Sequence, residues 1–478
     1  MWRRFSQFLG LLGFGLLAGA SAVNLGMKSI VLVPALTGMA VLFAIPNSAV
    51  YAIVATTPIN VIIAGPLTVA RVLIVLGFFV VFYQAFRRWI AFPRILYGPE
   101  GKLAFCFFIW IVIAKIGASG LSNPVSLGTF FIYAVLFYVL LNYVRNLAEF
   151  RSILILLAVV GALQAILVIC EAKFGFSPFG GWQAELAESL DSSETRVVGT
   201  SSHPIILAGF FQVVLACAGM LLATTKEARM RVIYAAMMLL YIAGWWFTFA
   251  RSSWIGLSGM IFVGLLLASR PTRILGLVGG AFLLVLLATH DFSLSAVIAS
   301  VESLGGVQNV TRTAGLADSS QSLQWRYENW YAAIAMWSQN PIFGVGLDLS
   351  PAFMIENMAL GSTAHNYIPP AVPHNMFLMV LAESGIVAFL LFIGIWILAF
   401  RALWIAQKDP VLRPYAIGIF CMMLGQIGTF WFNPMPREIW ISLALSAVLR
   451  QISVMRRVAA KSGSASKKAP PALKLQPQ

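Results

Sequence analysis

The sequence predicts an all-α polytopic membrane protein. Of the 478 residues, 60% are hydrophobic and only 10% are charged, whereas a soluble globular domain carries about 25% charged residues. The apolar residues form long runs, and a bilayer core takes roughly 20 of them as one helix. These observations predict about 12 to 14 transmembrane helices, with a large loop between two late spans.

Fourteen apolar segments are candidate spans. The pair 29–45 and 48–64 is the least regular, because it contains Pro34, Pro46 and Pro58, and it either crosses the membrane twice or re-enters it. The N-terminal segment resembles a signal peptide in outline, but further spans follow it, which favours an uncleaved first helix. The candidates are 8–23, 29–45, 48–64, 67–86, 103–117, 126–145, 152–172, 204–223, 230–247, 251–269, 272–289, 376–400, 412–431 and 437–452.

The charges predict an orientation. Most of the 32 Lys and Arg lie in loops that fall on one side of the membrane when the spans alternate, and most acidic residues fall on the other side. Basic loops stay in the cytoplasm, so both termini are expected to be cytoplasmic. This distribution also accounts for the net charge of +15 without a nucleic-acid partner.

The spans and loops divide the chain into four parts. Residues 1–289 are expected to form a multispan bundle with an outer loop at about 173–203, and residues 290–375 form a large outer loop or cap. Such a long loop in a compact protein is usually functional. Residues 376–452 form the last membrane helices, and 453–478 form a basic cytoplasmic tail that is expected to be disordered.

Arginine on the outer side runs against the charge trend and is therefore informative. Arg251 opens a span in "FARSSWIGLSG", where the guanidinium, two serines and the helix N-terminus can together bind a phosphate. The plain alternative is an arginine that snorkels to the headgroups. Arg437 also opens a span, but its neighbour Glu438 makes a local ion pair an equal alternative. The remaining candidates in this group are Arg71, Arg196 and Arg326.

Two of these arginines have structural alternatives of their own. Arg326 lies among aromatic residues and close to Glu328, so packing between indoles or a carboxylate pair would explain it. Arg196 follows four acidic residues, so a salt bridge would explain it. His203, just before Pro204, is expected to cap the helix that begins there.

Two His–Asn pairs, His365–Asn366 and His374–Asn375, precede the span that begins near 376. Pro373 keeps the chain out of a helix before His374, so the ring can project outward near a helix N-terminus, whose dipole favours the neutral imidazole. A neutral imidazole accepts a proton from an attacking hydroxyl. Asn375 can hold either the ring or a substrate. A structural histidine is the alternative, and spacing alone does not separate His374 from His365.

Several chemistries have no signature in this sequence. No His, Cys, Asp or Glu cluster has metal-ligand spacing, and no P-loop is present. The prediction is a transfer reaction without metal or cofactor that uses arginine electrostatics and a histidine base. A transporter is the competing class, but transporters place charged residues near the midplane, and the span interiors here almost lack them. The four cysteines are expected to be buried thiols: Cys106, Cys170, Cys217 and Cys421.

Three segments together carry a family resemblance. "FARSSWIGLSG", "WRYENWYAAIAMWSQNPIFGVGL" and "HNMFLMVLAESGIVAFLLF" occur in this order between about 247 and 393. The pattern resembles the O-antigen ligase and Wzy-type polysaccharide polymerase superfamily. The resemblance implies a GT-C-like fold in the bacterial inner membrane, with the active site at the periplasmic face.

The resemblance also implies substrates and roles. The donor would be a glycan on undecaprenyl pyrophosphate, and the acceptor either lipid A-core for a ligase or another lipid-linked glycan for a polymerase, which can work with a chain-length regulator. The second long loop with Arg196 favours the polymerase slightly. By motif, Arg251 and Arg326 would neutralise the pyrophosphate, His374 would be the base, and Glu383 would be polar packing. The expected substrate-binding residues are Arg196, Asn375, Arg437 and Arg71.

Overall fold

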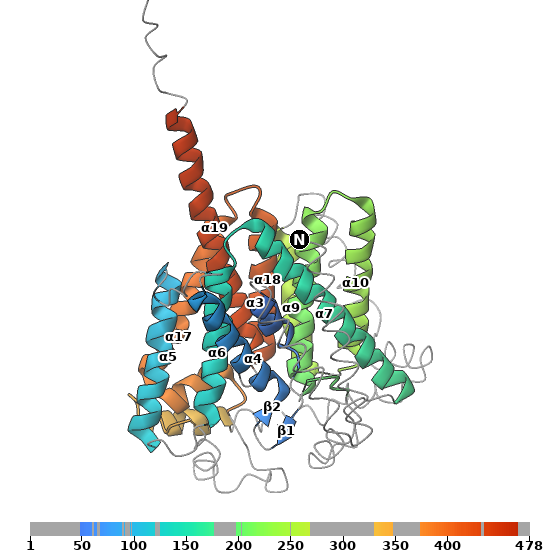
Figure 1. Cartoon of the computed structure of the whole chain (residues 1–478). Coiled ribbons are helices and arrows are strands. Elements are labelled where there is room, and N and C mark those ends of the chain that lie inside the picture. Colours follow the sequence, from blue (N-terminus) through green and yellow to red (C-terminus); the bar gives the residue numbers. More distant parts are fainter. Residues whose placement is uncertain are drawn as a thin grey trace, which may run out of the picture.

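The structure is a computed structural model, and its described part is a bundle of helices (Figure 1). Three expected spans, 8–23, 29–45 and 272–289, lie outside the described residues. The candidates Arg196, Arg326 and His365 lie outside them as well. The described residues are 48–59, 62–64, 67–87, 90, 96, 98–119, 125–175, 197–201, 203–248, 250–267, 329–347, 373–431 and 435–466.

The helices follow the apolar runs, so the prediction of an all-α membrane protein is confirmed. In chain order they are α3 (Ser48–Ala55), α4 (Val69–Phe86), α5 (Gly98–Ser119), α6 (Val125–Tyr143), α7 (Leu147–Phe174), α9 (Pro204–Thr224), α10 (Ala228–Trp246), α11 (Arg251–Leu267), α17 (Met376–Ala406), α18 (Arg413–Phe430) and α19 (Glu438–Ser466). A further helix covers 329–339.

Length and composition identify the helices that can cross a membrane. Among the described residues, five are long and apolar enough, within α5, α7, α9, α17 and α19, and shorter apolar helices lie within α4, α6 and α11. The structure thus supports a membrane-embedded protein. These helices need about 20 apolar residues to cross the bilayer core without tilting or thinning it.

The segment 48–64 is not a single membrane-spanning helix, which corrects one of the two alternatives for this region. Helix α3 is eight residues long, which is about 12 Å and too short to cross. A turn follows it, and β1 (Ile62–Ala64) then pairs antiparallel with β2 (Leu67–Thr68). Pro58 lies in the turn, where its missing N–H costs no helical hydrogen bond. A re-entrant arrangement agrees better with this part of the chain.

The aromatic core is centred on the last helix. Trp440 of α19 is fully buried. Its indole lies 5.6 Å from the ring of Phe107 in α5, 6.1 Å from Tyr133 in α6 and 6.2 Å from Phe392 in α17. Four helices therefore converge on one side chain, which fixes the start of α19 among α5, α6 and α17.

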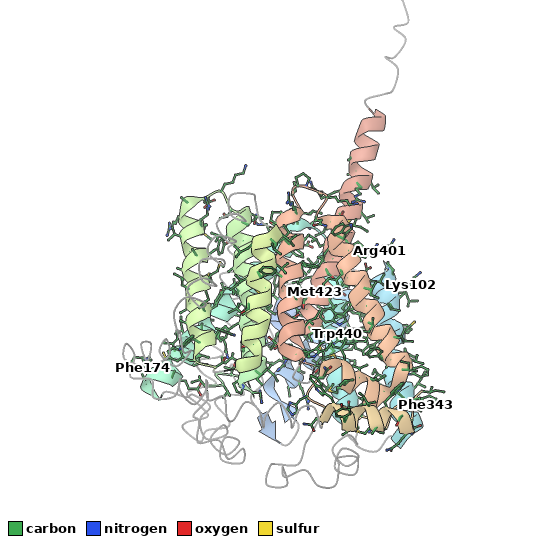
Figure 2. The ribbon with its side chains drawn as sticks, turned by 180° about the vertical axis from the view of Figure 1, so that it is seen from behind. Lys102, Phe174, Phe343, Arg401, Met423 and Trp440 are labelled. Atoms are coloured by element: carbon green, nitrogen blue, oxygen red, sulfur yellow. The ribbon has the colours of Figure 1, made fainter. Side chains whose placement is uncertain are left out.

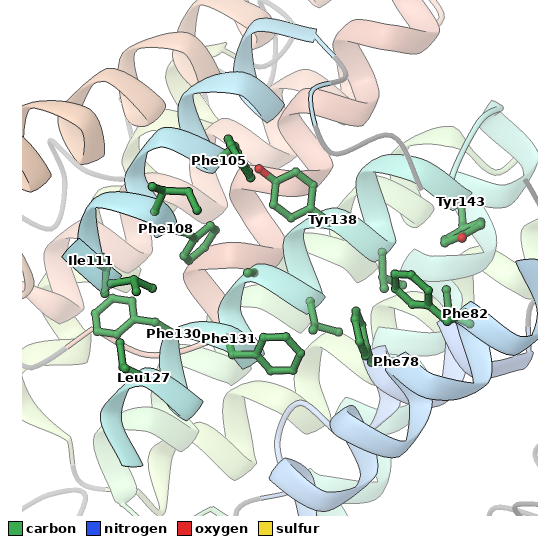
Figure 3. Close-up of a pocket in the computed structure, with 16 residues that line it drawn as sticks. Phe78, Phe82, Phe105, Phe108, Ile111, Leu127, Phe130, Phe131, Tyr138 and Tyr143 are labelled. Carbon is green, nitrogen blue, oxygen red and sulfur yellow. The ribbon is translucent and has the colours of Figure 1, made fainter. Parts of the chain in front are cut away.

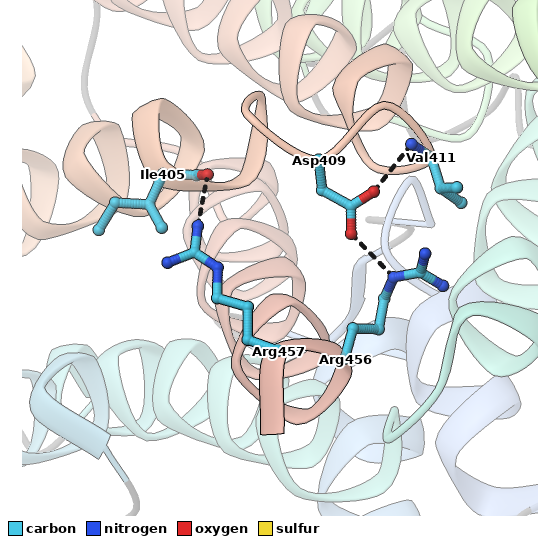
Figure 4. Close-up of polar contacts among 5 residues, drawn as sticks. All are labelled: Ile405, Asp409, Val411, Arg456 and Arg457. Atoms are coloured by element: carbon cyan, nitrogen blue, oxygen red, sulfur yellow. Dashed lines mark hydrogen bonds and ion pairs between the residues drawn. The ribbon is translucent and has the colours of Figure 1, made fainter. Parts of the chain in front are cut away.

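The prediction of a disordered tail is wrong for residues 453–466, and residues 467–478 lie outside the described residues. Residues 453–466 continue α19 as a helix that projects beyond the bundle (Figure 1). Arginine and alanine are good helix formers, and two arginines tie the projecting segment to the last turn of α17 and to the loop before α18 (Figure 4). Arg456 Nε donates to Asp409 Oδ2 at 2.8 Å, and Arg457 Nη2 donates to the Ile405 carbonyl at 3.2 Å.

The two ends of the bundle differ in charge. Lys102 and Arg401 lie at the end from which α19 projects, whereas Phe174 and Phe343 lie at the opposite end (Figure 2). We call these the basic end and the motif end. The helices α4, α6, α9, α17 and α19 begin toward the motif end (Figure 1). The start of α11 lies on the same side, because Ser253 contacts Gln212 of α9, which contacts Thr429 near the end of α18. The described candidates at helix starts therefore lie toward one end of the bundle.

Candidate functional site

His374 lies immediately outside the first turn of α17. Asn375 is the N-cap of this helix, and its Oδ1 accepts hydrogen bonds from the N–H groups of Phe377 at 2.9 Å and Leu378 at 3.1 Å. Trp330 donates its indole N–H to the His374 carbonyl at 3.4 Å. The backbone at His374 is therefore fixed from both sides. The capping bonds leave only the amide nitrogen of Asn375 for a substrate.

Helix α17 is broken at Gly385, where φ is 76° and ψ is −178°. This conformation is almost restricted to glycine. The break removes the next N–H partners of two carbonyls, and N–H groups from a distant segment replace them. Val345 donates to the Ala382 carbonyl at 2.9 Å, and Gly346 donates to the Glu383 carbonyl at 3.1 Å. The backbone groups at the break are thus satisfied, as burial requires.

Residues 341–347, which we call the clasp, are held from the other side by α5. Lys115, only 1% exposed, donates from Nζ to the Leu347 carbonyl at 2.9 Å. Trp110 donates to the Ser384 carbonyl at 3.0 Å and stacks on Phe343 with ring centroids 5.6 Å apart. The segments "NPIFGVGL" and "AESG" therefore form one structural unit, although about 40 residues separate them in the chain.

The helix 329–339 packs on the first part of α17. Ala332, Ala333 and Met336 form a small cluster with Val345 of the clasp and Ala382 of α17. Figure 2 shows this pair of short segments lying across the motif end, next to Phe343. The large loop is thus attached to the same helix start that presents His374.

A cluster of charged residues surrounds Tyr133 at the motif end. The phenol donates to the Met435 carbonyl at 3.0 Å, and it lies within electrostatic range of Arg437, Glu438, Arg71 and Glu383. The structure therefore brings Arg71 and Arg437 together, from α4 and from the start of α19. Arg71 also donates to Thr129 of α6 at 2.9 Å.

The acidic members of this cluster are buried. Glu438 is 0% exposed and Glu383 is 7% exposed. Neither carboxylate oxygen of Glu438 has a hydrogen bond from another described residue. Arg437 and Glu438 attract each other electrostatically, which agrees with the local pair that the sequence left open. A buried carboxylate needs a nearby positive charge, so Arg437 stabilises Glu438 whatever else it binds.

The start of α11 is anchored by a buried polar network. Gln212 of α9 donates to the Ser253 carbonyl at 2.9 Å and accepts from the Thr429 hydroxyl of α18 at 3.0 Å. Trp245 of α10 donates to the Ser253 hydroxyl at 2.9 Å. Three helices, α9, α10 and α18, therefore fix the first turn of α11, where Arg251 stands. The side chain of Arg251 is not among those described.

The network also gives the depth of Arg251. Gln212 lies eight residues, about 12 Å, below the start of α9, while Ser253 lies two residues, about 3 Å, below the start of α11. Because the two residues are in contact, α11 begins about 9 Å below the start of α9. The helix that begins at Arg251 therefore starts inside the bundle rather than at its rim. Electrostatic interactions inside the bundle are stronger than in water.

The outcome differs among the predicted residues. His374, Asn375, Arg71 and Arg437 are described and lie at the motif end with the start of α11. The expected capping role of His203 is confirmed, because its Nδ1 accepts from the Ile205 N–H at 3.2 Å. Within the described part of the chain, no group of three or more His, Cys, Asp or Glu could hold a metal ion.

Sequence reasoning missed three contributors. Lys115, Tyr133 and Gln212 join the site through contacts with residues distant in the chain. Of the three, only Lys115 could have been found from the sequence, because an ionisable residue within an apolar run is a candidate functional residue by default.

These features define a membrane-embedded helical protein with a broken helix, buried charges and a helix-start histidine at one end of the bundle. Comparison with known proteins then shows what the chain resembles. Residues 236–393 match the model of a family described as O-antigen ligase. An O-antigen ligase from Pseudomonas aeruginosa is 28% identical over 220 residues, which is 45% of this chain and 52% of that protein. The resemblance to the O-antigen ligase and Wzy-type superfamily is therefore confirmed.

The extent of these matches is limited. The chain matches about half the length of the curated relative, and the family match contains Arg251, Arg326 and His374 but not Arg71 or Arg437. The break at Gly385 also falls inside the matched segment. The match thus covers the clasp and the broken helix as well as the helix-start histidine.

Proposed function

We propose that this protein is a metal-independent glycosyltransferase that moves a glycan from undecaprenyl pyrophosphate to a hydroxyl group of an acceptor glycan. The observation that carries the proposal is the placement of His374 at a fixed helix start, within the segment that matches the O-antigen ligase family. The motif end would face the periplasm of a bacterial inner membrane, with both chain termini in the cytoplasm. The basic opposite end supports this orientation.

In the proposed reaction, His374 accepts the proton of the acceptor hydroxyl. The oxygen forms a bond to the anomeric carbon of the donor while the bond from that carbon to the phosphate oxygen breaks. The electron pair leaves with the lipid pyrophosphate. Arg251 and Arg326 would stabilise the charge that develops there, because fixed guanidiniums in a low-dielectric site require little reorganisation. Arg71, Arg437 and Arg196 would help to hold the donor.

The acceptor distinguishes two forms of this activity. The long outer loop favours a polymerase, which adds to another lipid-linked glycan, but both matched descriptions are of O-antigen ligases. We therefore propose transfer to lipid A-core as the first form to test. Polymerisation remains the second form, for which the sequence itself gives the support.

The test uses purified protein in detergent with undecaprenyl-pyrophosphate-linked glycan. Lipid A-core is supplied in one reaction and omitted in the other. Transfer only with lipid A-core indicates a ligase, and chain growth without it indicates a polymerase. His374→Ala is expected to slow the transfer by at least about 100-fold, since a general base contributes roughly 10² to 10⁴.

A second histidine provides the matched control. His203→Asn keeps an efficient N-cap on α9 and is expected to retain the transfer rate within about twofold. A normal rate for His374→Ala would refute the assignment of His374. Loss of activity in His365→Ala alone would transfer the role of base to that residue.

A further inference from the structure

An apolar groove lies at the surface of the bundle, where several of its lining side chains are exposed. Helices α4 and α5 both pack against α6, and a cavity of about 320 Å³ lies between them (Figure 3). Phe78 and Phe82 come from α4, Phe108 comes from α5, and Phe131 and Tyr138 come from α6. A cavity lined by these side chains suits an apolar ligand.

Aromatic contacts between helices shape the walls. Phe78 of α4 meets Phe131 of α6 edge to face, with ring centroids 5.2 Å apart. Phe108 of α5 lies 6.5 Å from Tyr138 of α6. The Tyr138 hydroxyl donates to the Gly101 carbonyl at 2.7 Å, so its ring presents only apolar surface to the groove. The walls are therefore held in place by contacts between neighbouring helices.

The groove is long. Its lining on α6 extends from Leu127 to Tyr143, which are 16 residues and about 24 Å apart. The hydrocarbon core is about 30 Å thick, so one leaflet contributes only about 15 Å. A phospholipid acyl chain that starts at its own headgroup ends near the middle of the bilayer. The groove therefore suits an apolar chain longer than that.

Positively charged side chains lie near the end of the groove that is closest to the motif end. Arg71 stands seven residues before Phe78 on α4, and two helical turns place the two on the same face. Arg71 bridges to Thr129 of α6 at 2.9 Å, beside the groove residues of that helix. Arg437 lies within electrostatic range of Arg71. A ligand that matches both parts has an anionic head and a long apolar tail.

We propose that the groove between α4 and α5 binds the polyprenyl tail of the donor, while Arg71 and Arg437 contact its pyrophosphate. This inference rests on the proposed function, because it assigns a place to the lipid part of that donor. It also gives a role to the N-terminal half of the chain, which lies outside the family match.

The first experiment fills the groove. Ala134 of α6 lines it, and Ala134→Trp would occupy the space of the tail. KM is measured for two donors with the same glycan pyrophosphate, one on a long polyprenyl chain and one on a two-isoprene chain. We expect KM for the long donor to rise at least tenfold and KM for the short donor to stay within twofold. Ala236→Trp, at an exposed position of α10, is the matched control.

Two results would overturn the proposal. One is an unchanged KM for the long donor, and the other is an equal rise for both donors. Inactive wild-type protein with either donor would instead count against the proposed function. The second experiment does not depend on activity or on the Ala134→Trp variant.

The second experiment identifies the occupant directly. A photo-crosslinking benzoylphenylalanine replaces Phe131 in the groove or Phe262 on α11; both phenylalanines are exposed, by 42% and 57%. The full chain is placed in phospholipid bilayers that contain long-chain polyprenyl pyrophosphate. We expect the polyprenyl lipid to label position 131 at least fivefold more than position 262. Labelling of phospholipid alone, of residues 1–47 of the same chain, or of both positions equally would refute the proposal.

Discussion

The two ends of the bundle differ in how their charged residues are held. At the basic end, Arg456 and Asp409 are 44% and 21% exposed and pair across the surface, and the one strongly buried carboxylate described there, Glu100, forms an ion pair with Arg450. At the motif end, Lys115 and Glu438 are 1% and 0% exposed. Exposed pairs contribute little to stability, and their sign sets the orientation in the membrane. Buried charges are costly and persist where they serve a site.

The backbone differs between the ends in the same way. The basic end contains ordinary helix ends, such as the Gln407 cap of α17. The motif end contains a broken helix whose carbonyls are satisfied by the clasp. Irregular backbone at membrane depth is tolerated only where protein or an aqueous cavity surrounds it. The comparison indicates that the irregular backbone at the motif end holds the clasp and the first part of α17 in fixed positions.

The largest expected effect comes from closing the break in α17. In Gly385→Ala, the added Cβ would collide with the Ile342 carbonyl oxygen, and the backbone conformation would be strained. Strain and overpacking each cost about 1 to 3 kcal/mol, so we expect about 3 kcal/mol of destabilisation. Thermal unfolding in detergent and the transfer assay measure this.

Gly128→Ala is the control for that variant, because a Cβ at Gly128 in α6 meets nothing within 4 Å. It is expected to be neutral or slightly stabilising, since alanine favours a helix by about 1 kcal/mol over glycine. If both variants unfold at the same temperature, the break in α17 is not a structural requirement.

The break at Gly385 is also a feature of the fold that the sequence did not predict. Hydropathy predicted most described helices, because about 20 apolar residues can satisfy their backbone only as a helix in lipid. It did not predict the break at Gly385, because the replacement N–H groups come from Val345 and Gly346. It also failed at 453–466, where Asp409 and the Ile405 carbonyl anchor the helix.

The next largest expected effect is a change in KM, tested by substituting one arginine at each end of the bundle. Arg437→Gln is expected to raise KM for the lipid-linked donor by about 10- to 100-fold, since a hydrogen bond to a charged group contributes about 1.5 to 3 kcal/mol. Arg457→Gln removes an exposed contact with the Ile405 carbonyl and is expected to leave KM within twofold. Steady-state kinetics with a saturating acceptor measure both variants. Equal KM changes would remove the functional contrast between the ends.

For the candidate site, sequence reasoning succeeded where the signal is local. His203 stands directly before its helix, so its capping role follows from a few neighbouring residues. Asn375 stands in the same position before α17, but it was expected to hold the ring of His374 or a substrate, and its role as the N-cap was not predicted. Lys115 bonds to a carbonyl 232 residues away, and Gln212 bonds to Thr429 217 residues away. No periodicity or spacing contains such pairs, because packing between helices decides them.

The smallest expected effect tests the exposed pair at the basic end. Burial alone would raise the pKa of Asp409, but the hydrogen bonds from Arg456 and from the Val411 N–H outweigh it and lower the pKa below 3.8. A carboxyl with a depressed folded pKa contributes stability above its unfolded pKa and loses it as the pH falls through the folded value. Asp409→Asn should therefore destabilise the protein by less than about 1 kcal/mol at pH 7.

The pH dependence separates this effect from a general loss of packing. The difference in unfolding temperature between wild type and Asp409→Asn should shrink below pH 3.8, where the wild-type carboxyl takes up its proton. Glu227→Gln serves as the control for the loss of an exposed acidic side chain, because this carboxylate at the start of α10 makes no side-chain capping bond. A difference for Asp409→Asn that stays constant down to pH 2 would mean that Arg456 contributes through packing rather than charge, and the contrast between the two ends would then rest on burial alone.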